Sequence, residues 1–171
     1  KIICCVRDLP WILDSFERIS AKNSLYGATL TDDEARQTVT TRCDALMDVK
    51  KDGQVVKPYY FLEEGLLLNP DMIMLVEYES LCKQPESVMR EIYSFIGKPY
   101  FDHDFKNVEY ENEVFDKNLN MKSLHTVRKE VTWQERPTIL PKSVWDKYSG
   151  KEFWRTPAPE FSMKQLYKVK G

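Results

Sequence analysis

Residues 2–10 read IICCVRDLP, an unbroken apolar run that ends at Arg7 and leads into Pro10. A short, continuous apolar run is typical of a parallel β-strand that is buried on both faces. Proline is favoured at the first position of an α-helix, because the N–H that it lacks is not needed there. The stretch therefore predicts a buried strand over residues 1–6 and a helix over residues 10–22.

An arginine at the end of this strand and a serine in the following helix form a candidate phosphate site. The guanidinium group of Arg7 carries a planar fork of donors that matches phosphate oxygens, and open α/β sheets bind ligands at the carboxyl ends of their strands. The predicted inward face of the helix carries Ile12, Phe16 and Ile19. Ser15 lies beside this face, eight residues after Arg7. The alternative is a surface arginine that pairs with Asp8, beside a solvated serine.

A second segment supports the first. Residues 72–81 read MIMLVEYESL, which predicts a strand over residues 72–77 that ends just before Tyr78. A helix is predicted over residues 85–96, and its end reads FIGKP at residues 95–99. In this order, the two segments resemble sulfotransferases that use 3′-phosphoadenosine-5′-phosphosulfate (PAPS). The first is similar to the family's 3′-phosphate-binding strand and helix, and the second to its strand that ends in Tyr-Glu-Asp-Leu.

The resemblance covers roughly residues 1–150 and is strongest in these two segments. It implies that Arg7 and Ser15 hold the 3′-phosphate of PAPS and that Tyr78 approaches the adenine. Without the family, Tyr78 is equally well explained as a half-buried residue at the edge of a sheet.

A basic pair later in the chain resembles the family's Arg-Lys-Gly segment, which closes over the 3′-phosphate. Arg128 and Lys129 match the pair, and Trp133 follows. Glu130 stands where the family has glycine, and it places a negative charge beside the anion. The resemblance implies that Arg128 and Lys129 cap the phosphate, and the alternative is an ordinary surface charge cluster.

The 171 residues are enough for a single domain with a hydrophobic core, and no linker or repeat divides them. We expect a 3′-phosphate-binding strand and helix over residues 1–16, a helical substrate-side region over 31–70, a strand and helix over 72–100, and an irregular cap and tail over 101–171. Two strands are too few for a stable parallel sheet, so we expect further strands upstream or from another chain. The expected fold class is α/β: a partial P-loop-type parallel sheet flanked by helices, rich in helix, with an irregular C-terminal segment.

Local signals predict three further helices. Residues 31–34 read TDDE, a capping box that predicts a helix extending to Met47. Pro58 predicts the start of an apolar helix over residues 59–68. A short helix is predicted within residues 140–150.

The composition limits which binding partners and which cellular compartment we expect. The net charge of −2 gives no overall attraction to nucleic acid or to an anionic membrane, and no apolar run reaches the length of a membrane span. The four cysteines show neither metal-binding spacing nor a disulfide framework. We therefore expect no nucleic acid, no metal, and free thiols in a reducing, cytoplasmic compartment. A Cys43–Cys82 bridge is one alternative, and a Golgi lumen would apply if a preceding segment carried an anchor.

The resemblance implies transfer of a sulfuryl group from PAPS to a hydroxyl or amine, with 3′-phosphoadenosine-5′-phosphate (PAP) as product. The acceptor is expected to be a small molecule, carbohydrate, lipid or peptide. The family's phosphate-cradling loop and its catalytic base precede the arginine-to-serine segment, and this chain contains neither. Neither His103 nor His125 stands at the base position, so the catalytic residue is unknown. We expect the C-terminal part of a sulfotransferase, completed by an N-terminal segment or in a homo-oligomer.

Two other functions remain open on the residues alone. A P-loop kinase-like fragment also places arginines near phosphates, and it would prefer ATP to PAP. A non-catalytic α/β interaction module would share the strand and helix pattern, would bind no nucleotide and would be indifferent to changes at Arg7.

Overall fold

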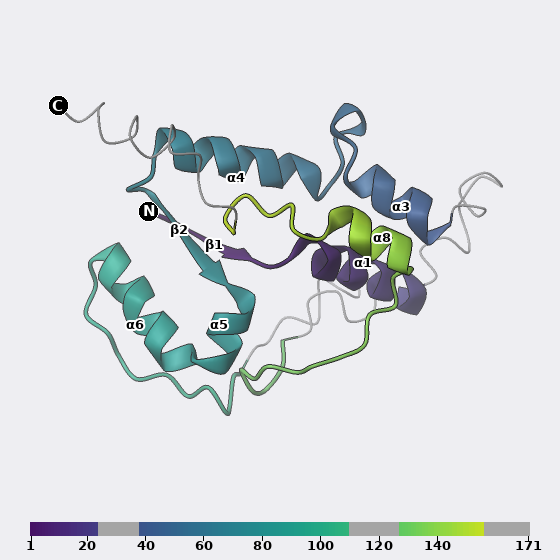
Figure 1. The fold of residues 1–171 in the computed structure, drawn as a ribbon. Coiled ribbons are helices and arrows are strands. Elements are labelled where there is room, and N and C mark those ends of the chain that lie inside the picture. The colour runs from purple at the N-terminus through teal and green to yellow at the C-terminus, as the bar shows by residue number, and fades with distance from the viewer. Residues whose placement is uncertain (24–37, 110–126, 156–171) are drawn as a thin grey trace.

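The computed structural model describes residues 1–23, 38–109 and 127–155 (Figure 1). The elements in chain order are β1 (Ile2–Val6), α1 (Leu9–Asn23), α3 (Val39–Leu46), the 3₁₀ helix η1 (Val49–Lys51), α4 (Val56–Leu68), β2 (Ile73–Glu77), α5 (Tyr78–Lys83), α6 (Pro85–Ile96) and α8 (Lys142–Tyr148). The fold is α/β and rich in helix, which confirms the expected class.

The two strands form a small parallel sheet. Ile2 lies opposite Ile73, and Val6 lies opposite Glu77. Figure 1 shows α4 on one side of the strands and α5 with α6 on the other. The prediction that β1 is buried along its length is wrong: only Val6 of this strand is buried, and Ile2 and Ile3 are 54% and 43% exposed. The reason is that a parallel strand is buried only where neighbouring strands and helices cover it on both faces.

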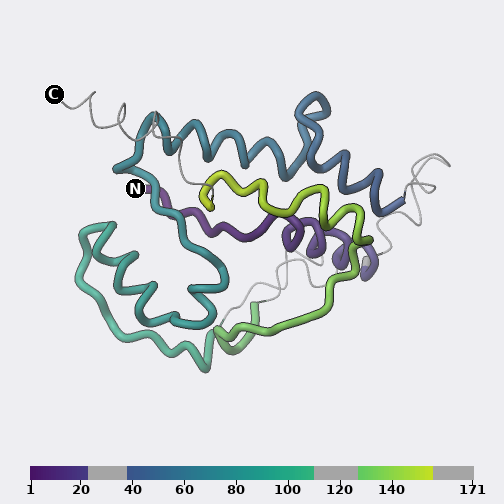
Figure 2. Tube along the Cα trace, viewed as in Figure 1, coloured from purple at the N-terminus to yellow at the C-terminus, as the bar shows by residue number. Residues whose placement is uncertain are grey.

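The hydrophobic core lies between α1, α3 and α8. Its buried residues are Leu9, Leu13, Cys43, Val55, Leu140, Val144 and Tyr148. Figure 2 shows α8, in yellow-green, running beside α1, in purple, although the two are far apart in the sequence. The buried face of α1 is centred on Leu9 and Leu13, whereas Ile12 and Phe16 of the predicted face are half-buried at its edge.

Two helix starts differ from the predictions. α3 begins at Val39, because Thr38 is extended and its side chain accepts a hydrogen bond from the N–H of Thr41 as a helix cap. The capping box predicted at residues 31–34 lies outside the described residues. α4 begins at Val56, two residues before Pro58. Proline is tolerated throughout a first helical turn, since the N–H groups there have no acceptor within the helix.

The described residues that follow α6 are irregular, as expected, apart from α8. Residues 98–109 and 127–139 contain no helix or strand. They are joined by backbone hydrogen bonds from Val108 to Lys129, at 2.7 Å, and from Val131 to Phe105, at 2.8 Å. These bonds hold the segment with Arg128 and Trp133 in a defined course back toward α1.

Candidate functional site

Arg7 and Tyr78 lie next to each other where the two strands end. Because Val6 is opposite Glu77 in the sheet, the residues that follow them leave the sheet at the same edge. The guanidinium carbon of Arg7 lies 4.7 Å from the centre of the Tyr78 ring. The structure thus brings together two residues that the sequence singled out separately.

Aromatic rings surround the Arg7 guanidinium. The ring centres of Trp11 and Trp133 lie 5.1 Å and 5.5 Å from its central carbon, in addition to Tyr78. Such cation–π contacts stabilise a cation that is partly withdrawn from water. The Nε atom of Arg7 is nevertheless buried without a hydrogen-bond partner among the described residues. Buried donors are nearly always paired, so this one indicates room for an acceptor.

A second arginine faces the same space from a distant segment. A cavity of about 320 Å³ is lined by Arg7, Trp11, Trp133, Gln134, Glu135 and Arg136. The Nε atom of Arg136 is also buried and unpaired within the described part of the chain. Burial, and then repulsion from Arg136, lower the pKa of the Arg7 guanidinium. Two cations that share a cavity repel each other, and a bound anion relieves that repulsion.

A buried carboxylate on α1 holds Arg136 in place. Nη2 of Arg136 forms an ion pair with Oδ2 of Asp14, at 2.8 Å. Asp14 is fully buried, and it also accepts hydrogen bonds from Arg18 Nε and from the N–H of Ile139, both at 2.8 Å. Burial by itself raises the pKa of the Asp14 carboxyl, but these hydrogen bonds outweigh it and hold the pKa below its usual value. The ionised carboxylate therefore anchors the Arg136 segment to α1.

Ser15 contacts Arg136 and is not among the residues that line the cavity. Its hydroxyl donates to the carbonyl oxygen of Trp11 at 3.0 Å and accepts from Nη2 of Arg136 at 3.0 Å. The serine lies in the predicted place on α1, one to two turns into the helix. In this structure it acts on the cavity through Arg136.

Arg128 and Lys129 are exposed, and neither lines the cavity. Burial, and then a hydrogen bond with Cys82, raise the pKa of the Tyr78 hydroxyl, and the positive charge of Arg128 opposes this shift. Arg128 is therefore within electrostatic reach of Tyr78. That the basic pair caps a phosphate stays a prediction.

Sequence reasoning missed Arg136. It lies in an irregular stretch, where no periodicity indicates which way a side chain points. The one available signal was its place three residues after Trp133.

The other sequence candidates contribute less to this site. His103 packs against Phe101, with ring centres 4.2 Å apart, and His125 lies outside the described residues. Cys43 and Cys82 are free thiols, so the alternative of a bridge between them is wrong. Within the described ranges, no group of acidic, histidine and cysteine side chains could hold a metal ion. None of the described helices has the length and apolar character needed to cross a membrane.

Comparison with known proteins identifies the family of the chain. A family model described as a sulfotransferase domain matches residues 1–165. No curated protein and no solved structure matches the chain significantly. The family match includes both strand ends and every residue that lines the cavity. The resemblance seen in the sequence is thereby confirmed, and the chain belongs to the sulfotransferase-domain family.

Proposed function

We propose that this chain is the nucleotide-binding part of a PAPS-dependent sulfotransferase, and that Arg7 and Arg136 together bind the 3′-phosphate. The observation that carries the proposal is the cavity that both arginines line, in which each has a buried, unpaired Nε atom. A phosphate monoester bears about 1.5 to 2 negative charges at neutral pH, which matches two guanidinium groups. Ser15 supports this role by holding Arg136 at 3.0 Å.

The aromatic residues beside the cavity are proposed to contact the adenosine. The rings of Tyr78 and Trp133 lie 6.0 Å apart and are tilted, so that they present two apolar surfaces beside Arg7. Stacking of a base on an aromatic side chain contributes about 1–3 kcal/mol. Arg128 and Lys129 are proposed to contribute less to nucleotide binding, because both are exposed. Arg128 still acts electrostatically on Tyr78.

The proposed reaction moves a sulfuryl group from PAPS to a hydroxyl or amine of a small molecule, carbohydrate, lipid or peptide. PAPS supplies the activated sulfuryl group. The bond between sulfur and the nucleotide phosphate breaks, a bond from the acceptor oxygen or nitrogen to sulfur forms, and the acceptor proton passes to a base. Displacements of this kind depend on orientation of the reactants. Arg7, Arg136 and Tyr78 would fix the nucleotide for that purpose.

The acceptor is proposed to bind on the α4 side of the strands. An open, mainly apolar cavity of about 580 Å³ lies there, and its lining includes Phe61 and Leu62 of α4 and Ile2 of β1. This supports the expectation that the helical region over residues 31–70 shapes the acceptor pocket.

Nucleotide titrations test the proposal directly. Isothermal titration calorimetry would compare PAP with 5′-AMP, which lacks only the 3′-phosphate, and with ATP. We expect PAP to bind most tightly. A charge-assisted hydrogen bond is worth about 1.5–3 kcal/mol, so Arg7→Gln should weaken PAP binding about tenfold or more and leave 5′-AMP unchanged.

Arg90→Gln on α6 is the matched control, because Arg90 is exposed and pairs with Glu86. Equal affinities for PAP and 5′-AMP would refute the 3′-phosphate site. Tighter binding of ATP than of PAP would favour the kinase-like alternative.

A further inference from the structure

A short segment near the end of the described chain lies between α4 and the strands. Figures 1 and 2 show it in yellow, after α8. We call residues 151–155 the clasp. Its contacts reach the residues that flank Arg7 and Tyr78.

Glu152 of the clasp completes the start of α1. Its buried carboxylate accepts the N–H of Leu9 at 2.7 Å, across 143 residues of sequence. Leu9 is the first residue of α1, the next residue is Pro10, which has no N–H, and Trp11 donates to the carbonyl of Asp8. Glu152 therefore pairs an N–H that the helix itself leaves free. Its negative charge is also favourable at a helix N-terminus.

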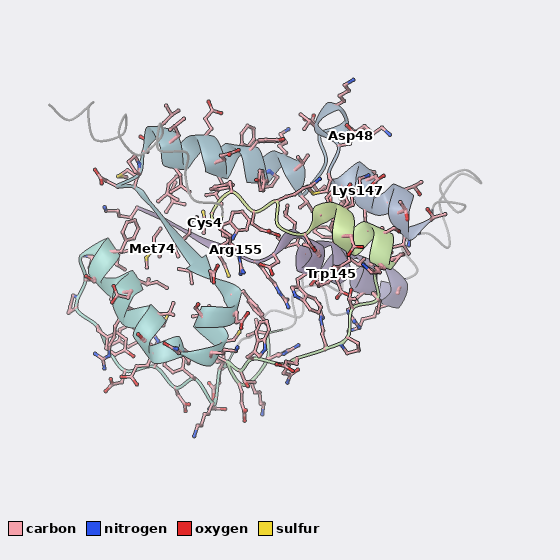
Figure 3. The ribbon with its side chains drawn as sticks, in the orientation of Figure 1. Cys4, Asp48, Met74, Trp145, Lys147 and Arg155 are labelled. Atoms are coloured by element: carbon pink, nitrogen blue, oxygen red, sulfur yellow. The ribbon has the colours of Figure 1, made fainter. Side chains whose placement is uncertain are left out.

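Arg155 of the clasp joins the ends of the two strands. Its Nη2 atom lies 2.8 Å from Oδ1 of Asp8 and 3.2 Å from Oε1 of Glu77. Figure 3 shows Arg155 beside the strand ends. Asp8 directly follows Arg7, and Glu77 directly precedes Tyr78. The Arg155 guanidinium thus holds the residues next to Arg7 and Tyr78, the two side chains proposed to bind the nucleotide.

The same segment is attached to α4. The hydroxyl of Tyr59 donates to the carbonyl oxygen of Lys151 at 2.7 Å. The Tyr59 ring packs on Phe153 and Trp154, with ring centres 5.2 Å and 5.9 Å away. The clasp therefore connects the helix on the proposed acceptor side to the strand ends.

We propose that Glu152 and Arg155 are positioning residues, which set the spacing of Arg7 and Tyr78 and so determine the selectivity for the 3′-phosphate. This inference rests on the proposed function. Neither Glu152 nor Arg155 lines the cavity. Both act through Leu9, Asp8 and Glu77, which lie next to Arg7 and Tyr78.

The test measures selectivity, which a merely structural role would not change. For each variant, calorimetry gives the ratio of the affinities for PAP and 5′-AMP, and thermal unfolding gives Tm. We expect Glu152→Ala and Arg155→Met each to lower the ratio at least threefold. Glu152→Gln keeps an acceptor oxygen for Leu9 and should restore most of it. Lys142→Met, which removes an exposed ion pair with Asp146 on α8, is the matched control and should leave the ratio unchanged.

The outcomes separate this inference from the function on which it rests. An unchanged ratio in Glu152→Ala and Arg155→Met, with or without a lower Tm, would refute the positioning role of the clasp but not the proposed nucleotide site. A wild-type protein with no preference for PAP would overturn both. If Glu152→Ala does not fold, Arg155→Met decides alone, because Arg155 is 45% exposed and its removal leaves the core intact.

Discussion

Asp14 illustrates how one residue shapes the site. It lies on the buried side of α1, next to Leu13, and is fully withdrawn from solvent. A buried carboxylate is tolerated only when its oxygens are paired. Here the partners include the Arg136 guanidinium, in an ion pair, and the N–H of Ile139, and both belong to a segment more than 100 residues away. The carboxylate therefore directs the course of that segment and brings the second arginine to the cavity.

At the residue scale, the structure and the sequence resemblance point to different residues as the second cation at the phosphate: Arg136 and Arg128, respectively. We expect Arg136→Gln to weaken PAP binding about tenfold or more, because a hydrogen bond to a charged group is worth about 1.5–3 kcal/mol. Arg128→Gln should weaken it less than about fivefold, since exposed charge pairs contribute about 0.2–1 kcal/mol. Calorimetry on the two variants gives the order, and the reverse order would favour the basic pair as the phosphate cap.

At the scale of elements, the turn between η1 and α4 depends on a glycine. A Cβ atom on Gly53 would lie 2.4 Å from the carbonyl oxygen of Leu46 and 2.7 Å from that of Ala45. Both atoms belong to the backbone, so the chain itself would have to move. We expect Gly53→Ala to lower the free energy of unfolding by about 1–3 kcal/mol, the usual range for overpacking, as measured by urea denaturation.

Gly65, in the interior of α4, is the matched control for this prediction. Its Cβ would lie 3.0 Å from the end of the flexible Ile73 side chain. Alanine is favoured over glycine in a helix by about 1 kcal/mol, so Gly65→Ala should be neutral or stabilising. Equal losses in the two variants would contradict the close approach at Gly53.

At the scale of the whole molecule, the core should weaken at alkaline pH. Burial raises the pKa of the Cys43 thiol to about 11. Burial, and then the hydrogen bond to Asp44, also raise the pKa of Tyr148 in the same cluster. The folded protein thus holds these protons more tightly than the unfolded chain. Their stabilisation is complete below the unfolded pKa and is lost as pH rises through the folded pKa.

We therefore expect the free energy of unfolding to fall between about pH 8.5 and pH 11, with about 2–3 kcal/mol of the loss due to Cys43. Urea denaturation across this range measures it. Cys43→Ala should show a shallower decline, whatever its stability at neutral pH. Identical slopes for the two proteins would contradict an elevated pKa at Cys43.

Local patterns were enough to predict the strands and several helices. β1, β2 and α6 form within one residue of their predicted bounds, because the strands are specified by contiguous apolar residues and α6 by Pro85 at its start and Gly97 at its end. The burial of β1 was not predictable in this way, since it depends on which other segments cover the strand. The start of α4 also differed, because proline is compatible with several positions in a first turn.

The sequence by itself determined the α/β class, the place of Arg7 and Tyr78 at the ends of their strands, and the sulfotransferase-domain resemblance. Each of these depends on short-range order along the chain. Only the tertiary structure decided that Arg136 shares the cavity with Arg7, and that Glu152 and Arg155 hold the strand ends. These residues lie in stretches without periodicity, and their positions follow from contacts with residues far away in the sequence, which no local pattern encodes.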